Sequence, residues 1–337
     1  MHQLQHLPST SLAALARVCA LFLLAFLSLA SAACSTTPHK SNAPLTPAPT
    51  TTSSRSIPIY DGKQGTRVTW DNLLIRAAAA DIIIIGENHN HPVGLPWAAT
   101  LFEGLAEKAP LIALSLEFFE RDDQSRLDDY LKGVTDEAAF RKRTARTPGN
   151  YPEGHRRMIQ AAKAHGRPVI ASNTPWSIIR FLRGKPYYSL SALTPEQKRL
   201  YRIPDSPPEG RYRADFDAIM GPMAEASRGT KPGEKPAPLT DEERQARLDT
   251  SFRAQSLWDW TMADSVVKAA EVGAKPVVHV IGRFHSDFFG GTPQAIATLR
   301  PGASILIISV VDHNSATLAD ADKNRGDFVV YVGPSPD

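Results

Sequence analysis

Short apolar runs rich in β-branched residues recur along the chain and alternate with longer amphipathic segments. The runs that predict β-strands are residues 81–85, 111–116, 168–172, 276–281, 304–311 and 328–332. Because these runs are apolar at almost every position, both faces of each strand should be buried, as in a mainly parallel sheet covered by helices. Apolar residues at helical spacing predict helices over residues 97–108, 122–132, 151–165 and 257–272. This alternation indicates an α/β fold with a mainly parallel sheet flanked by helices.

The region between residues 176 and 255 departs from this alternation. It contains no strand-like run, and Pro, Gly and charged residues are frequent. Short helices are expected at residues 178–183, 195–201, 212–226 and 241–254, and a mobile loop at residues 229–238. We therefore predict an α/β core formed by residues 58–175 and 256–337, with residues 176–255 inserted as a small helical subdomain.

The N-terminal segment has the pattern of an export signal. One basic residue, Arg17, precedes an apolar run over residues 18–27, and small residues follow up to Ala33. A membrane-spanning helix needs about 20 apolar residues, so the run is too short to span a bilayer and instead has the length of a signal-peptide core. Residues 1–33 are therefore predicted to be a signal peptide.

Cys34 directly follows the small residues, and this ending resembles a bacterial lipobox. We predict that Cys34 is lipidated and anchors the chain in the cell envelope; Ser35, in place of Asp, favours the outer membrane. The alternative is ordinary signal cleavage, which would leave Cys34 as a free thiol. Residues 34–57 consist largely of Ser, Thr, Pro and Ala, so they are expected to form a disordered tether.

Composition adds two limits. The chain has two cysteines, and Cys19 lies in the predicted signal, so the mature chain cannot form an internal disulfide and must rely on an apolar core. The formal net charge of +3 over 337 residues gives no indication of nucleic-acid binding.

Polar residues follow five of the predicted strands. Ligands of parallel α/β sheets bind beyond the carboxyl ends of the strands, so these ends predict a site. The residues concerned are Glu87, His89, Glu117, Asn173, His285, Asp312 and His313. Each alone has a structural explanation: either Glu could cap a helix, for example, and Asn173 could begin the turn before Pro175. The more specific signal is a Gly-x-x-His motif that occurs twice, each time directly after a buried strand.

With neighbouring segments, these motifs resemble the ChaN-like lipoproteins, which belong to a superfamily with the Tiki proteases, the TraB-type proteins and the erythromycin esterases. The matching segments are residues 86–92, 116–124, 170–175, 254–263 and 279–287. The resemblance covers about residues 80–310. Many relatives carry a His pair shortly after the first motif, whereas this chain has Val93-Gly94-Leu95-Pro96 there.

The resemblance implies a parallel sheet with a small helical domain, haem binding and a role in iron acquisition, with Tyr as the type of haem ligand. The candidate haem contacts are Tyr187, Tyr188, Tyr201, Tyr212 and Asn173. Arginines in the insertion would suit the haem propionates. The first hypothesis is therefore an exported lipoprotein that binds haem at the bacterial cell envelope. Its expected partners are haem, the membrane and envelope iron-uptake components, and a homodimer is also considered.

Two other functions stay open. In a metal-dependent hydrolase, His89, Glu117 and His285 would hold a divalent ion such as Mn, Co or Zn, and Glu87 would act as general base on a bound water. In the third hypothesis, the fold is a catalytically silent binding module.

Overall fold

The structure, a computed structural model, describes residues 51–147, 149–226 and 239–335. The predicted signal peptide, Cys34, most of the predicted tether and the expected loop at 229–238 lie outside these residues. Helix α2 (Thr51–Arg55) falls within the segment expected to be unstructured. No helix in the described part of the chain is long and apolar enough to span a membrane.

An eight-stranded sheet forms the centre of the fold, with the strand order β2-β1-β8-β7-β3-β6-β4-β5. The strands are β1 (Ile59–Asp61), β2 (Arg67–Val68), β3 (Ile82–Glu87), β4 (Ala113–Glu120), β5 (Val169–Asn173), β6 (Val277–Gly282), β7 (Ile305–Val311) and β8 (Phe328–Tyr331). The six strands predicted from apolar runs all form and are mutually parallel. Strands β1 and β2, which were not predicted, add an antiparallel edge. The predicted α/β class is confirmed.

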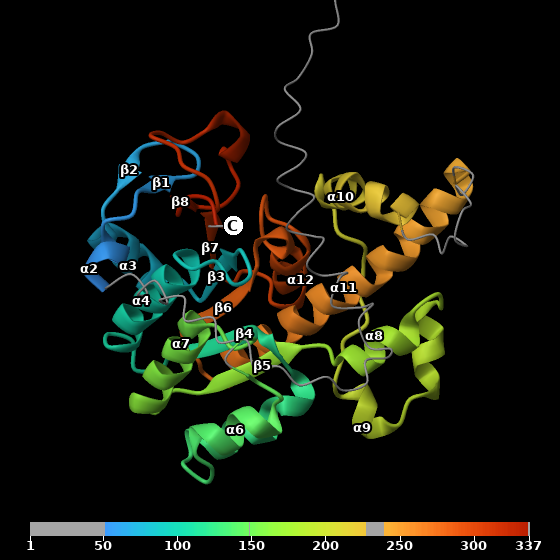
Figure 1. The fold of residues 1–337 in the computed structure, drawn as a ribbon, viewed down its shortest axis with the longest axis horizontal. Helices are drawn as coiled ribbons and strands as arrows, with labels where there is room; N and C mark the ends of the chain where they lie inside the picture. Colours follow the sequence, from blue (N-terminus) through green and yellow to red (C-terminus); the bar gives the residue numbers. More distant parts are fainter. Residues whose placement is uncertain (1–50, 148, 227–238, 336–337) are drawn as a thin grey trace, which may run out of the picture. The chain divides into compact units, whose positions relative to one another are not determined.

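The described residues also form helices, several of which pack against the sheet (Figure 1). They are α3 (Trp70–Ala79), α4 (Gly94–Ala106), α5 (Gln124–Leu131), α6 (Glu137–Arg143), α7 (Glu153–Ala164), α8 (Trp176–Leu182), α9 (Pro195–Lys198), α10 (Tyr212–Ala226), α11 (Asp241–Glu271) and α12 (Gly291–Leu299). The short 3-10 helices are η1 (Arg121–Asp123), η2 (Tyr187–Ala192), η3 (Arg283–His285) and η4 (Asp320–Asp322). The two helices expected at 241–254 and 257–272 form one continuous helix, α11.

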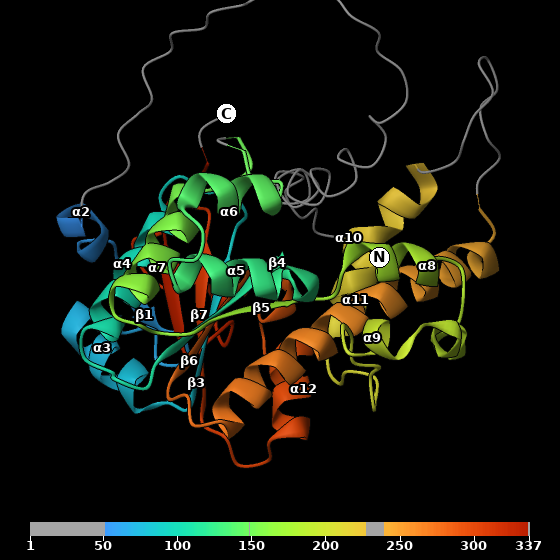
Figure 2. The ribbon, with the colours of Figure 1, turned by 90° about the horizontal axis from the view of Figure 1, so that it is seen from below.

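Strand β3 shows why the apolar runs are continuous. Ile83 and Ile85 pack into the core formed with α3, α4 and α7, whereas Ile82 and Ile84 pack against α11 and α12. Alternate side chains of a strand point to opposite faces, so a strand between two helical layers needs apolar residues at every position. Figure 2 shows α4 and α7 on one side of the sheet and α12 on the other.

The region expected to form a helical insertion contains helices and no strand among its described residues. Helix α8, η2 and the residues after α9 gather around a small apolar cluster that includes Leu257 of α11. The ring of Trp176 stacks on that of Trp258, with 5.6 Å between centroids. Residues 214–248 belong to a separate compact unit, in which Arg244 of α11 pairs with Glu225 of α10 at 2.9 Å.

Candidate functional site

The two Gly-x-x-His motifs lie side by side because β3 and β6 are neighbours, with Glu87 in register with Gly282. The Gly282 amide donates to Glu117 Oε2 at 2.5 Å. A Cβ atom at Gly282 would lie 2.9 Å from His89 Nε2 and 3.4 Å from Glu117 Oε2, so a larger residue would crowd both groups. His285 Nε2 lies 3.7 Å from Glu117 Oε1. The structure therefore brings His89, Glu117 and His285 together at the carboxyl ends of β3, β4 and β6.

A buried carboxylate fixes the orientation of His89. Its Nδ1 lies 3.0 Å from Glu87 Oε1 and donates to it. The other oxygen of Glu87 is 3.1 Å from Nε2 of His155, a buried residue of α7. With Nδ1 engaged in this way, Nε2 of His89 faces Gly282.

These contacts shift the pKa values of both groups. Burial raises the pKa of Glu87, but attraction and hydrogen bonding from His155 and His89 outweigh it and lower that pKa to about 2. Burial lowers the pKa of His89, yet its bond to Glu87 and the attraction of Glu117 raise that pKa to about 9. Both oxygens of Glu87 are engaged by histidines, so to act as a general base Glu87 would have to give up one of these contacts.

His285 has a similar arrangement on the other side of Glu117. Its Nδ1 lies 2.7 Å from Oδ1 of Asp259, a residue of α11. Asp259 also accepts from Thr292 Oγ1 at 2.7 Å and from the Tyr212 hydroxyl at 2.8 Å. Burial lowers the pKa of His285, but the attraction and hydrogen bond of Asp259 raise it overall. We call Glu87, His89, Glu117, His155, Asp259 and His285 the imidazole cluster.

The predicted metal site has no support from this geometry. Among the described residues, no group of three or more His, Cys, Asp and Glu side chains is arranged to hold a metal ion. The pairing of an imidazole with a buried carboxylate is common around metals, but it also orients imidazoles that transfer protons.

The four candidate tyrosines differ in their surroundings. The hydroxyls of Tyr187 and Tyr201 donate to the carbonyl oxygens of Arg253 and Leu190, at 2.7 and 3.2 Å. Tyr212 is buried against Asp259, and burial together with that charge raises its pKa well above the usual value. Tyr188, by contrast, is 79% exposed.

Asn173 is the last residue of β5. Its side-chain oxygen accepts from the Thr174 amide at 2.9 Å.

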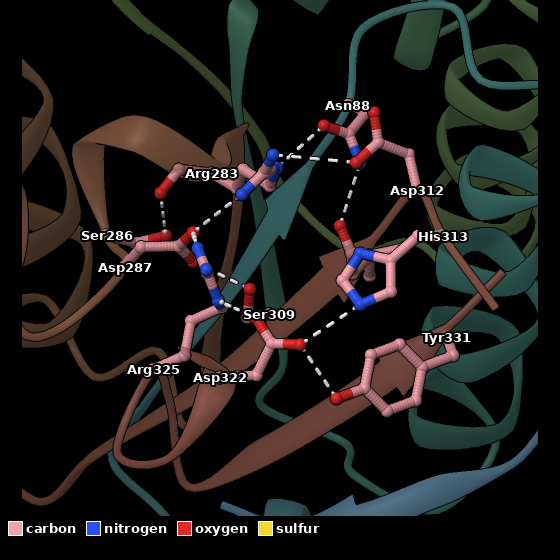
Figure 3. Close-up of polar contacts among 11 residues, drawn as sticks. Asn88, Arg283, Ser286, Asp287, Ser309, Asp312, His313, Asp322, Arg325 and Tyr331 are labelled. Atoms are coloured by element: carbon pink, nitrogen blue, oxygen red, sulfur yellow. Dashed lines mark hydrogen bonds and ion pairs between the residues drawn. The ribbon is translucent and has the colours of Figure 1, made fainter. Parts of the chain in front are cut away.

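The polar residues after β7 belong to a different group, which we call the arginine network (Figure 3). Arg283 bonds Asn88 at 2.7 Å and pairs with Asp287 at 3.1 Å and Asp312 at 3.5 Å. Arg325 pairs with Asp287 at 2.6 Å and with Asp322 at 2.8 Å. Asp322 also accepts from the Tyr331 hydroxyl at 2.7 Å and lies 3.2 Å from His313 Nε2.

Sequence reasoning missed two members of the imidazole cluster, His155 and Asp259. His155 lies in a predicted amphipathic helix, where a single His carries no particular signal. Asp259 lies within the segment 254–263 that supports the family resemblance, and this was the available indication of its role.

The family model described as haem-binding uptake, Tiki superfamily, ChaN matches residues 73–296. The chain belongs to this family. The resemblance found in the sequence is thereby confirmed, and the matched residues include both Gly-x-x-His motifs, Glu117 and the four candidate tyrosines.

The solved structures that resemble this chain include a ChaN protein and an erythromycin esterase. The structure of cofacial haem binding to ChaN of Campylobacter jejuni matches with a TM-score of 0.59 and 16% identity, over 81% of this chain and 96% of that chain. An erythromycin esterase, EreC in its open conformation, matches with a TM-score of 0.41 and 13% identity, over 82% of this chain and 83% of that chain. At these identities the likeness concerns the fold, and the second score is too low to support any argument.

A plant protein is also similar. RETICULATA-RELATED 5, a chloroplastic protein of Arabidopsis thaliana, is 23% identical over 291 residues, which cover 83% of this chain and 37% of that protein. The chain therefore spans little more than a third of the length of this relative.

Proposed function

We propose that this member of the ChaN family binds haem and that Tyr188 is the iron ligand. Family membership supports haem as the molecule that is bound. The choice of Tyr188 as the iron ligand rests on its exposure, which is 79%. A tyrosine can coordinate haem iron through its phenol oxygen. The hydroxyls of Tyr187, Tyr201 and Tyr212 donate to protein oxygen atoms instead, so each would have to give up a hydrogen bond to bind iron.

The surroundings of Tyr188 fit a flat, anionic cofactor. The ring of Tyr187 and that of Phe181 pack at the edge of the apolar cluster of α8 and η2. Lys185 lies three positions before Tyr188, and its ammonium is 4.0 Å from the centre of the Phe181 ring. A cation at this position could pair with a haem propionate. When bound, haem would supply an iron centre, while these residues would hold its face and its charged edge.

An absorbance titration with haemin tests this proposal. The purified full chain, kept in a mild non-ionic detergent, should give a saturable shift of the Soret band. Tyr188→Phe should abolish the shift, and Tyr187→Phe, the neighbouring control, should retain it. A flat titration of the wild type would overturn haem binding. A Tyr188→Phe variant that binds like the wild type would overturn the choice of ligand.

The setting of this activity is also proposed: export, lipidation of Cys34, and haem capture for iron acquisition at the cell envelope, on the outer membrane. Support comes from the short apolar run and the small residues before Cys34. Wild-type chain should fractionate with outer membranes, and Cys34→Ser should be released into the soluble envelope fraction. Equal membrane association of both would contradict the lipid anchor. Growth with haemin as the iron source should depend on the gene.

A homodimer is proposed on a separate ground. The Campylobacter jejuni ChaN binds haem cofacially, and an exposed Tyr188 would present a haem at the surface of this chain, where a second copy could face it. Light scattering should show that haemin doubles the molar mass of the wild type and leaves Tyr188→Phe unchanged. A monomer with haemin bound would exclude the dimer and leave haem binding intact.

The imidazole cluster favours a second candidate function, hydrolysis. Both motif histidines bond a buried carboxylate through Nδ1, and His285 Nε2 lies 3.7 Å from Glu117 Oε1, an arrangement that suits proton transfer to a substrate. The full chain should hydrolyse p-nitrophenyl acetate faster than His285→Ala. Added Mn, Co or Zn would raise that rate if the cluster closes around an ion. Equal hydrolysis rates of the wild type and His285→Ala, both without added metal and with Mn, Co or Zn, would mean that the imidazole cluster has a structural role alone.

A further inference from the structure

A pocket of about 480 Å³ lies away from Tyr188, on the face of the sheet covered by α12. The loop before α10 forms one wall, α11 forms the floor with Asp259 and Trp260, and the turn after η3 and helix α12 complete the lining. Its lining residues include Glu209, Arg211, Trp260, Phe288, Phe289 and Ala297. This volume is in the range of pockets that hold small molecules.

Two consecutive phenylalanines form one side of the pocket in an unusual backbone conformation. Phe288 and Phe289 have φ angles of 57° and 58°, in the left-handed region that bulky residues rarely adopt. Such a conformation costs on the order of 1–3 kcal/mol per residue and tends to occur at ligand sites. The Phe288 amide bonds the Arg325 carbonyl at 2.8 Å, and the Phe289 carbonyl accepts from Gln294 at 2.8 Å. The turn is thus held in place, and Phe289 remains 45% exposed.

The neighbouring glycines let this turn pass close to buried groups of the protein. A Cβ at Gly291 would collide with the Asp259 carboxylate and the Tyr212 ring, and one at Gly290 would lie 3.0 Å from the His285 carbonyl. The turn therefore passes close to the imidazole cluster and places both aromatic rings next to the pocket.

Arg211 is the cation among the lining residues that the structure describes. Its guanidinium carbon lies 4.0 Å from the centre of the Phe288 ring, and the guanidinium carbon of Arg325 lies 4.6 Å from the same centre. The lining carboxylate of Asp259 is engaged by His285, Thr292 and Tyr212. Glu209 is the other charge, and both Glu209 and Arg211 are exposed.

We propose that this pocket binds a small aromatic carboxylate, with its ring beside Trp260, Phe288 and Phe289 and its carboxylate paired with Arg211. The aromatic walls would bury the apolar ring, and the planar guanidinium suits the two oxygens of a carboxylate. The site is independent of the proposed haem ligand.

Calorimetric titration of the full chain with 2-naphthoate tests the proposal. Wild type should bind at one site. Arg211→Gln should weaken binding about tenfold, the loss of roughly one charge-assisted bond. Glu209→Gln, the matched control, should bind equally or more tightly because it removes a negative charge. The neutral 2-naphthalenemethanol should bind more weakly than 2-naphthoate and should not respond to Arg211→Gln.

A pocket-filling variant locates the site. Ala297→Trp should abolish binding, and Phe289→Ala should weaken it if the larger substitution prevents folding, as checked by circular dichroism. Tyr188→Phe should bind 2-naphthoate like the wild type. No binding to the wild type, or unchanged binding in folded Ala297→Trp and Phe289→Ala, overturns the proposed site. Equal binding by Arg211→Gln and wild type overturns the carboxylate assignment.

Discussion

The imidazole cluster and the arginine network occupy the carboxyl ends of neighbouring strands in the same sheet and use similar residue types, yet they are built differently. In the arginine network, Arg283 and Arg325 bridge several carboxylates and keep their charge at any physiological pH. In the imidazole cluster, the cations are histidines, whose charge depends on their surroundings. The separation between His285 and Glu117, 3.7 Å, is also longer than the arginine contacts.

This difference indicates a structural role for the arginine network and a role in proton transfer for the imidazole cluster. Arginine–carboxylate pairs with short contacts hold the segments after β6, β7 and β8 in fixed positions, because removing either partner leaves a buried charge. Imidazoles that are oriented by a carboxylate at one nitrogen and approach a second carboxylate with the other can gain or lose a proton. We therefore expect changes in the arginine network to affect stability, and changes in the imidazole cluster to affect stability and its dependence on pH.

The largest expected effect is that of Asp322→Asn. Asp322 is buried and faces Arg325, Tyr331 and His313, so the change should lower the free energy of unfolding by about 3–5 kcal/mol, as measured by urea denaturation. The matched control is Asp320→Asn, two positions earlier and 94% exposed, which should leave stability unchanged. Equal stability of the two variants would show that the arginine network does not stabilise the fold. Haemin binding should stay unchanged in both.

Glu87→Gln should have the next largest effect. The carboxylate is buried and bonded by His89 and His155, so an uncharged amide should lower the free energy of unfolding by on the order of 3 kcal/mol. Glu107→Gln, an exposed position at the end of α4, serves as control and should behave like the wild type. A stable Glu87→Gln variant would mean that the two histidines do not depend on this charge.

The pH dependence of stability should separate the two clusters more finely. The pKa of Glu87 is lowered to about 2, so its stabilisation is present above pH 4.5 and is lost as pH falls toward 2. The pKa of His89 is raised to about 9, so its stabilisation is present below pH 6.5 and is lost as pH rises through 9. The His89 side chain is 35% exposed, so we expect a smaller effect than that of Glu87→Gln.

Urea denaturation at a series of pH values measures these slopes. Glu87→Gln should flatten the curve in both ranges, because it removes the low-pKa carboxylate and the main partner of His89. Asp322→Asn should shift the whole curve downward and keep both slopes. If Asp322→Asn flattened the curve instead, the two clusters would not be electrostatically distinct.

The smallest expected effect is that of Thr292→Val. It removes one of three donors to Asp259 and should cost about 1 kcal/mol of unfolding free energy, because the tyrosine and histidine donors remain. Thr298→Val, at an exposed position later in α12, is the control. A loss above 3 kcal/mol of unfolding free energy would indicate that Thr292 alone determines the position of Asp259, and that the other two donors do not hold it in place.

The sheet could be predicted because a parallel strand that is buried on both faces needs apolar residues at almost every position, and such continuous apolar runs are visible in the sequence. Strands β1 and β2 could not be predicted, because they have three and two residues, and β1, which pairs with β2, acquires its other partner from β8, far along the chain. The boundaries of the helical insertion, residues 176 and 255, stay a prediction.

The candidate site was predicted in part. His89, Glu117 and His285 do lie together, since the motif glycines end adjacent strands. Asp312 and His313 follow a neighbouring strand but join the arginine network, because Arg283 and Asp322 bind them. The sequence shows which residues follow the strands, whereas the partners of each side chain depend on loops and helices whose packing no local pattern encodes.

The strand order has a consequence for how the chain acquires its structure during synthesis. Strand β3 lies in the first third of the sequence, whereas both strands that flank it, β6 and β7, lie within residues 277–311. A nascent chain of 250 residues would therefore lack the hydrogen-bonding partners of its central strand on both sides. Long-range pairing of this kind slows folding, so the sheet should assemble only after nearly all of the polypeptide has left the ribosome. Such a delay would suit the export proposed above, because a translocation channel could then accept the chain while it is still unfolded.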